Sequence, residues 1–398
     1  MSAACMQPRR WLRAAFALLL AMVAGPMAWG QNAAPLAIGL TAEFGIPNGH
    51  AAQAIEKGIQ LALREINDQG GVLGRMLVLK KRDDRGLPAR ATDNFRELAA
   101  SPDVMAVFCG RFSPVALELA PIAQELGVPL LDPWAAADEI VRQPAPNYVF
   151  RLSLTDTWAM QALLGHAQKR GYSRLALLVP NTAWGRSSEA AALAHAKKIR
   201  TINLSVHWYN WGDTDFASHL ARVRAEGAQA LIMVANDFEG SRIVMEMATL
   251  APAQRLPIIS HWGIVGGDFA AATGDALREV DLVVVQTFSF SGARSRRAQT
   301  VAAGVKRLFG HDVDSLRSQV GFAHAYDLTY LLAAALRKAG RPDRAVIRDA
   351  LEGIVRHEGL VGDYLRPFSA SDHEALDRRH VFIARFDARG NLRALGSN

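Results

Sequence analysis

Short apolar runs alternate along the chain with longer segments in which apolar residues recur every three or four positions. Ile55, Ile59, Leu63 and Ile66 show this helical spacing within residues 50–67. The first part of the chain predicts strands over 36–40, 76–84, 104–110 and 128–133, and helices over 50–67, 91–100 and 114–126. Strands that alternate with helices are typical of βαβ units in a mostly parallel sheet. The sequence therefore predicts an α/β fold.

The same pattern restarts near residue 148. Strands are predicted over 148–152, 174–180, 204–208, 230–235 and 257–260, and helices over 156–170, 184–198, 215–226 and 239–250. A third stretch predicts strands over 281–288 and 380–387, helices over 297–309, 320–339 and 343–351, and a turn at Gly390-Asn391. Residues 36–45 and 175–185 share one plan, an apolar strand followed by a polar loop, an aromatic residue and a glycine. This indicates two lobes built alike, with chance similarity of two βα turns as the alternative.

No long Pro/Gly/Ser linker separates the two halves of the chain. Independent domains on a tether normally show such a linker, so several short crossings between the lobes fit better. Loops at the carboxyl ends of the strands would then line a cleft between the lobes, where α/β sheets bind ligands.

Residues 1–30 have the three parts of a secretory signal peptide. Arg9, Arg10 and Arg13 form a positive region, an apolar run from Ala14 to Val23 follows, and small residues flank Trp29. We expect export to the periplasm and cleavage near Gly30. The Arg9-Arg10 pair leaves the twin-arginine route open beside the general secretory one.

The composition is that of a globular protein, with 50% apolar and 21% charged residues in 398 positions. The net charge is +7. Without the three leader arginines, 42 Lys and Arg face 38 Asp and Glu, a mild +4 spread over the chain. A nucleic-acid partner would need a basic face, helix or tail, and none is seen. The mature chain keeps Cys109 alone, in an apolar stretch that indicates a buried thiol.

The chain shows no motif for a cofactor, a metal ion or catalysis. There is no phosphate-binding loop and no GxSxG elbow, and residues 263–268 do not match GxGxxG. His357, Glu358, His373 and His380 lack a recognised metal spacing. Asp83-Asp84 is better explained as a strand-end cap than as a cation site. We expect a binding protein without cofactor or metal rather than an enzyme.

Four segments resemble one family. They are "KGIQLALREINDQGGVLGRMLVL" (57–79), "RDDRGLPARA" (82–91), "GVPLLDPWAAADEI" (127–140) and "AWGRS" (183–187). They resemble the periplasmic substrate-binding proteins of branched-chain amino acid ABC transporters, of the leucine/isoleucine/valine-binding type, over residues 35–390.

The resemblance implies the class I periplasmic binding protein architecture. This consists of two Rossmann-like lobes with parallel sheets, joined by three crossovers, which close on a ligand by hinge motion. Lobe 1 would comprise residues 31–151 plus 286–360. Lobe 2 would comprise residues 152–285 plus 361–398.

The family's cleft residues are carried over position by position. Its carboxylate-binding serine falls at Ser113, and the small residue whose backbone helps to hold the ligand falls at Ala135. The next residue, usually a hydroxyl donor, falls at Ala136, and the second-lobe aromatic falls at Trp184. A further cleft position falls at Asn236 or Asp237, and the acid that pairs with the ligand's α-amino group falls at Trp262. The family's first-lobe disulfide is missing, with Gly86 and Phe112 near its two positions.

These departures bear on the ligand. Trp262 cannot pair with an ammonium group, and a buried unpaired charge is costly. Asp237 is an alternative anion at a different position. Trp134, Trp184 and Trp262 fall at loops that face the inferred cleft, although each is also compatible with packing on a lobe surface. Arg111 lies beside Ser113 and suits a carboxylate. Together these residues favour an apolar or aromatic acid over leucine, with a quaternary amine as the alternative.

The predicted function is that of an exported, monomeric solute-binding protein. It would capture a small organic ligand and deliver it to an inner-membrane ABC permease with its ATPase. A ligand sensor coupled to a regulator and an exported enzyme on the same fold are the alternatives. The sequence does not name the ligand.

Overall fold

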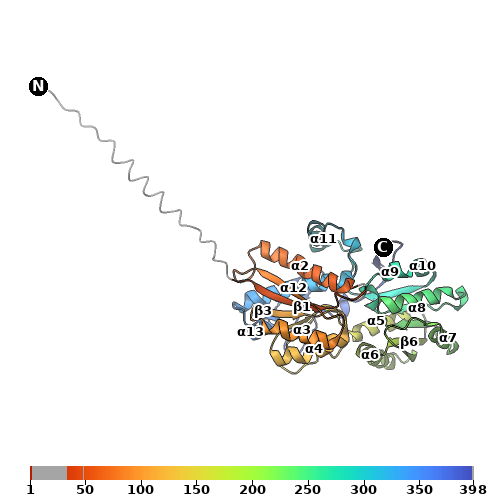
Figure 1. Cartoon of the computed structure of the whole chain (residues 1–398). Coiled ribbons are helices and arrows are strands. Elements are labelled where there is room, and N and C mark those ends of the chain that lie inside the picture. Colours follow the sequence, from red (N-terminus) through yellow and green to blue (C-terminus); the bar gives the residue numbers. More distant parts are fainter. Residues whose placement is uncertain (2–33, 48, 397–398) are drawn as a thin grey trace. The chain divides into compact units, whose positions relative to one another are not determined.

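The computed structural model describes Met1 and residues 34–47 and 49–396. The predicted signal peptide lies outside these residues except for Met1, and so does the predicted cleavage site near Gly30. The described chain from Pro35 onward contains two main sheets and a small two-stranded one. The two main sheets belong to two lobes (Figure 1).

The first sheet has five parallel strands in the order β2-β1-β3-β4-β5. Its elements are β1 (Leu36–Ala42), α2 (His50–Asp68), β2 (Leu77–Asp83), α3 (Pro88–Ala100), β3 (Val104–Phe108), α4 (Ser113–Leu126), β4 (Leu130–Asp132) and β5 (Val149–Arg151). Every residue of β1 and β3 is buried, as expected where helices cover both faces of a parallel sheet. The predicted parallel βαβ arrangement is confirmed.

The second sheet has seven strands in the order β14-β13-β10-β9-β8-β6-β7. Its parallel part comprises β6 (Arg174–Pro180), β7 (Asn203–Tyr209), β8 (Ala230–Met233), β9 (Ile258–Ser260) and β10 (Leu282–Gln286). The connecting segments hold α5 (Asp156–Lys169), α6 (Ala183–Ile199), α7 (Ala217–Ala225), α8 (Asp237–Thr249), η1 (Pro252–Gln254), η2 (Trp262–Gly266), α9 (Phe269–Thr273) and α10 (Ala276–Glu279).

Two antiparallel strands complete the edge of the second sheet. They are β13 (Phe382–Phe386), which pairs with β10, and β14 (Leu392–Ala394), which pairs with β13. β13 falls within the strand predicted over 380–387. β14 was not predicted, because three residues after a glycine turn show too little periodicity.

The remaining elements are α11 (Arg296–Phe309), η3 (Val313–Ser315), α12 (Gln319–Ala339), α13 (Arg344–Glu352), β11 (Arg356–Glu358), β12 (Asp363–Leu365) and η4 (Arg378–His380). Helix α12 packs against α2, although about 260 residues separate them (Figure 1). Glu65 of α2 accepts 2.6 Å hydrogen bonds from the hydroxyls of Tyr326 and Tyr330 on α12. A Cβ at Gly58 would collide with the carbonyl of Phe322, so the glycine permits this close approach. The late helix α12 therefore belongs with the first sheet.

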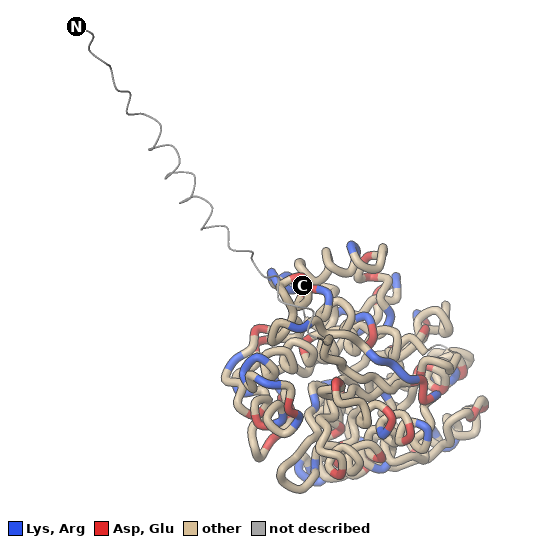
Figure 2. Tube along the Cα trace, turned by 60° about the vertical axis from the view of Figure 1, so that its left-hand side comes forward, with Lys and Arg blue, Asp and Glu red and all other residues tan. Residues whose placement is uncertain are grey.

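The surface carries charges of both signs. In Figure 2, Lys and Arg alternate with Asp and Glu over the visible face of the described chain. Among the helices that the structure describes, none combines the length and apolar character needed to cross a membrane. Cys109 is fully buried, and burial raises the pKa of its thiol, in agreement with the buried cysteine expected from the sequence.

Candidate functional site

A small cavity lies where loops from both lobes meet at the carboxyl ends of the parallel strands. It measures about 10 Å³, room for about one water molecule. Its lining residues are Arg111, Phe112, Ser113, Trp134, Ala136, Trp184, Trp211, Asn236, Trp262 and Gly263. Seven of the nine predicted site residues are among them. Ala135 and Asp237 do not line the cavity, although each adjoins a residue that does.

Ser113 is the first residue of α4, directly after the loop that follows β3. Its Oγ accepts hydrogen bonds from the backbone N–H groups of Ala136 and Ala137, at 3.1 and 3.2 Å. The Ser113 hydroxyl hydrogen stays available as a donor toward the cavity. The N-terminus of α4 adds a partial positive charge, which favours an anion here.

The loop after β4 presents Trp134, Ala135 and Ala136 to this region, and buried polar side chains hold it in place. Oδ1 of Asp132 accepts from the N–H groups of Trp134 and Ala135, at 2.9 and 2.7 Å. Burial raises the pKa of Asp132 to about 7. Arg151, which is buried and paired with Glu374, donates to the carbonyl groups of Ala135 and Ala137. The cleft loop is therefore fixed from both sides.

The three tryptophans predicted to face the cleft do come together. Trp134, Trp184 and Trp262 are 2, 6 and 1% exposed, and all three line the cavity. The rings of Trp134 and Trp262 lie 5.5 Å apart at an angle of 40°. The cavity wall is therefore largely indole, a large flat apolar surface.

A buried polar group fixes the orientation of Trp184. Its Nε1 donates to Oδ1 of Asp156 at 3.2 Å, and Ser188 donates to the same oxygen. His261, the residue before Trp262, places Nε2 3.1 Å from that oxygen and meets Trp184 edge-on at 5.1 Å. Burial raises the pKa of Asp156. This cluster positions the two second-lobe indoles and lies behind them, away from the cavity lining.

Arg111 is committed to protein carboxylates. Its Nη1 lies 2.7 Å from Oδ1 of Asp237 and its Nε lies 3.6 Å from Oε1 of Glu43. The guanidinium also stacks on Phe112, with its carbon 4.9 Å from the ring centroid. Asp237 therefore faces an arginine rather than the cavity. Nε of Arg111, by contrast, is buried without a hydrogen-bond partner among the described residues, and Arg111 itself lines the cavity.

Sequence analysis did not select Phe112, Trp211 or Gly263 as binding residues. The rings of Phe112 and Trp211, one from each lobe, lie 5.3 Å apart. Both are half-buried, in contrast to the fully enclosed indoles. Nε1 of Trp211 is buried and has no hydrogen-bond partner within the described residues. Trp211 could have been found, because it follows the predicted strand 204–208 at the same sheet edge as the other cleft loops.

Comparison with known proteins agrees with this architecture. A family model described as "Periplasmic binding protein" matches residues 35–391. This chain belongs to that family. Among curated relatives, a Leu/Ile/Val-binding protein homolog 1 from Brucella abortus is 23% identical over 360 residues, covering 89% of this chain and 91% of the relative. The expected resemblance to the leucine/isoleucine/valine-binding type is confirmed.

Solved structures show the same fold. A periplasmic binding protein type 1 from Bordetella pertussis has a TM-score of 0.81 at 20% identity, covering 90% of this chain and 99% of that one. A solute-binding protein of an ABC transporter from R. palustris, solved with 4-hydroxybenzoate, has a TM-score of 0.77 at 17% identity, with coverages of 90% and 95%. The predicted class I fold of two lobes is confirmed.

In this periplasmic binding protein, the two positions at which the resemblance implies a missing disulfide lie side by side. Gly86 and Phe112, near the missing disulfide's two positions, do adjoin: a Cβ at Gly86 would lie 2.7 Å from the Phe112 ring. The ring thus packs on a glycine with a φ of +70°, a backbone conformation that favours glycine. No group of three or more His, Cys, Asp or Glu side chains suited to a metal ion occurs in the described part of the chain.

Proposed function

We propose that this periplasmic binding protein captures a small organic acid with an apolar or aromatic body and delivers it to an ABC permease. One observation carries the choice of ligand class. Among the described residues that line the cavity there is no Asp or Glu, whereas three are enclosed tryptophans and one is Ser113 at a helix N-terminus. Ser113 and the N-terminus of α4 would bind the carboxylate of a ligand. An α-amino group would be buried without an anion to pair with it.

The size of the cavity implies motion. A space of about 10 Å³ admits no organic acid, so the lobes and side chains must separate before a ligand enters and close around it afterwards. Hinge closure of two domains around a ligand is a known mechanism of this kind. Phe112 and Trp211, which meet across the lobes, would part first because they are the most exposed of the aromatic contacts.

The similar proteins are associated with two classes of ligand, branched-chain amino acids and aromatic acids. The Brucella relative is named for leucine, isoleucine and valine, and the R. palustris structure contains 4-hydroxybenzoate. The cavity of this chain favours an aromatic acid, because Ser113, at the N-terminus of α4, lies beside walls made of indole rings. Trp184 and Trp262 would enclose the ligand body, Trp134 and Ala136 would complete the first-lobe wall, and Asn236 would offer an amide at the second-lobe side.

Calorimetry with matched acids tests the proposal. The pairs are 3-phenylpropionate against phenylalanine and 4-methylpentanoate against leucine, which share a body and differ by the α-amino group. We expect each amino acid to bind at least about a hundredfold more weakly than its matched acid, because about 2.7 kcal/mol is lost when the ammonium is left unpaired. Ser113→Ala should weaken the binding of both acids. Submicromolar binding of leucine would overturn the proposal and give Asp237 the ammonium role. Tight binding of betaine would instead favour a quaternary amine over the indole faces.

Export and the lobe boundaries complete the proposal. We propose that residues 1–30 are removed on export, and that lobe 1 comprises 31–151 plus 286–360 and lobe 2 comprises 152–285 plus 361–398. The two sheets support this division, since β5 ends at Arg151 and β10 ends at Gln286. Mass spectrometry of periplasmic protein should find no residues 1–30. Recovery of intact Met1 in that fraction would defeat the export part.

A further inference from the structure

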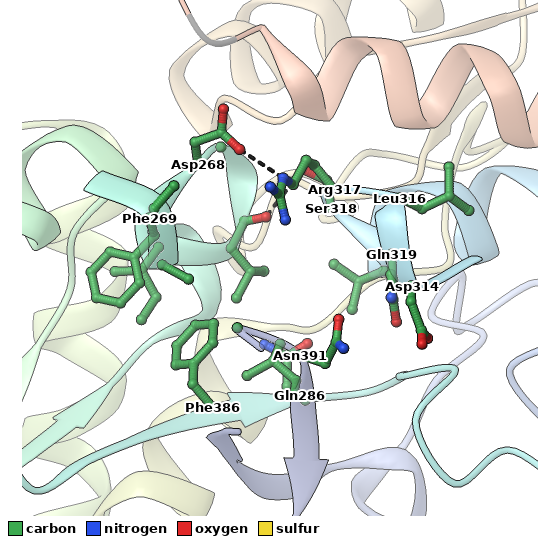
Figure 3. A pocket seen from close by; sticks show the side chains of 18 of the residues that line it. Asp268, Phe269, Gln286, Asp314, Leu316, Arg317, Ser318, Gln319, Phe386 and Asn391 are labelled. Atoms are coloured by element: carbon green, nitrogen blue, oxygen red, sulfur yellow. Dashed lines mark hydrogen bonds and ion pairs between the residues drawn. The ribbon is translucent and has the colours of Figure 1, made fainter. Parts of the chain in front are cut away.

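A second cavity, which we call the Gln286 cavity, lies beside the cleft cavity, at the end of β10. It measures about 60 Å³, several times the space that one water needs. Figure 3 shows Gln286 and Asn391 on one side, Phe269 and Phe386 beside them, and the paired Asp268 and Arg317 opposite.

Gln286 is the unusual residue of this cavity. Its side chain is 0% exposed, and neither Oε1 nor Nε2 has a hydrogen-bond partner within the described residues. Leaving a buried amide unpaired costs free energy, so such a group in a folded protein calls for an explanation. Because Gln286 lines the cavity, its amide can be satisfied by a molecule bound there.

The remaining lining defines the charge of that molecule. The buried wall is apolar and includes Val265, Leu316 and Val320. Arg317 forms an ion pair with Asp268, with Nε 2.7 Å from Oδ1. Asp314 contributes an exposed negative charge at the edge of the cavity. No cation is left over for an anionic ligand among these residues. A neutral molecule fits best.

The side-chain amide also defines the hydrogen-bond pattern. A glutamine amide presents a carbonyl acceptor and N–H donors side by side. A carboxamide or a urea offers the reverse pattern and would form two parallel hydrogen bonds with Gln286. We propose that the Gln286 cavity is a second binding site, for a small neutral amide.

The site adjoins the cleft through one short helix. Trp262 and Gly263 of η2 line the cleft cavity, whereas Ile264 and Val265 of the same helix line the Gln286 cavity. Ser318, which precedes α12 and has a φ of +58°, donates to the carbonyl of Val265 at 3.0 Å. Strained backbone of this kind clusters at functional positions. A molecule bound here would contact both η2 and the segment before α12, which are associated with different sheets.

Propionamide is the probe that tests the site, with propionate and butanone as controls of similar size. We expect propionamide to bind with a dissociation constant of about a millimolar, as its few atoms allow, and to shift the side-chain NH2 resonance of Gln286. Propionate carries a charge and lacks the donor, and butanone has only the acceptor, so both should bind at least about tenfold more weakly. A crystal soaked with propionamide should show it against Gln286.

Two variants separate this site from the cleft. Gln286→Leu keeps the size and removes the amide, so it should lower propionamide affinity by about tenfold or more. Ser113→Ala changes a residue that lines the cleft cavity and does not line the Gln286 cavity, so it should leave that affinity unchanged. Equal binding by Gln286→Leu, equal binding of propionate, or a soaked crystal holding only water in the cavity would overturn the proposal. Should Gln286→Leu fail to fold, the wild-type crystal and the ligand controls still decide. None of these outcomes depends on which acid the cleft binds.

Discussion

Nη1 of Arg111 and Oδ1 of Asp237 form a buried ion pair, 2.7 Å long, between the loop after β3 and the first residue of α8. The two side chains are 5 and 7% exposed. Cβ atoms at Gly266 and Gly267 would collide with Arg111 and Asp237, respectively, so glycines allow the backbone to cover the pair. The pair joins the two lobes directly. Because its partners lie on opposite sides of the cleft, the proposed hinge opening would break it.

Asp237→Asn should therefore favour the open form. The substitution leaves Arg111 buried with only Glu43 near it, and removing one partner of a buried pair costs about 3–5 kcal/mol. Opening of the lobes lets water reach the Arg111 guanidinium. The free-energy cost of the unpaired charge therefore shifts the population from the closed to the open form. We expect a larger radius of gyration by small-angle scattering and at least a tenfold loss of ligand affinity by calorimetry.

An exposed pair provides the control. Arg96 and Glu125 form a bidentate ion pair within the first lobe, on its surface. Glu125→Gln should leave both the radius of gyration and the affinity unchanged, since surface ion pairs contribute little. If Asp237→Asn behaves like Glu125→Gln, the Arg111–Asp237 pair does not govern closure.

Trp211→Phe should weaken binding without unfolding the protein. The substitution keeps an aromatic ring against Phe112 and removes the buried, unpartnered Nε1 donor. If that donor meets an acceptor on the acid, its loss costs about 1–1.5 kcal/mol, or roughly tenfold in affinity. Trp208→Phe, at an exposed position on β7, is the matched control and should bind as wild type. Equal affinity for all three proteins would remove Trp211 from the binding site.

The order and type of the main elements were predictable because they depend on periodicity. Runs such as 36–40 and 104–110 are apolar on both faces and became β1 and β3. The elements that were missed are short: β11, β12, β14, α9 and α10 have three to five residues each. Segments of that length span barely one turn or one pairing, and tertiary contacts decide their structure.

The site was predictable as a set of positions and less so as a set of partners. Ser113, Trp184 and Trp262 follow strand ends, which parallel topology brings to one sheet edge. The partner of Arg111 was not predictable, because Asp237 lies 126 positions away in the other lobe. The missing hydrogen-bond partner of Gln286 was not predictable for the same reason. It arises only when β10, η2 and the segment before α12 pack together.

Asp132→Asn should flatten the pH dependence of stability between about pH 4 and 7. Burial raises the pKa of Asp132 to about 7, against about 3.9 in the unfolded chain. The folded state thus holds a proton that the unfolded state has lost, and this stabilisation is full below pH 4 and disappears as pH rises through 7. Asparagine keeps an acceptor for the N–H groups of Trp134 and Ala135 and does not titrate. Urea denaturation at several pH values should show a decline smaller by up to about 4 kcal/mol.

Asp377 is a control with the opposite sign. Hydrogen bonding from Arg379 lowers the pKa of Asp377, so its contribution to stability is present at neutral pH and is lost as pH falls. Asp377→Asn should therefore lose stability at neutral pH relative to acid. Parallel pH profiles for wild type and Asp132→Asn would show that Asp132 is ionised in the folded protein at neutral pH.

Asp327 of α12 should be the main anchor of the chain segment after β11, near the predicted third crossover. Its carboxylate is fully buried and accepts from the N–H groups of Leu360 and Val361, at 2.7 and 2.9 Å, and from the hydroxyl of Tyr364 at 2.7 Å. Asp327→Ala leaves three donors unpaired, two of them buried, which should lower the free energy of unfolding by about 3 kcal/mol or more. Tyr364→Phe removes one donor and leaves the backbone bonds intact, so it should cost only about 1 kcal/mol. Urea denaturation of the two variants provides the comparison. A loss from Asp327→Ala no greater than that from Tyr364→Phe would mean that the segment is held by its packing, with Leu360 and Tyr364 both buried, rather than by this carboxylate.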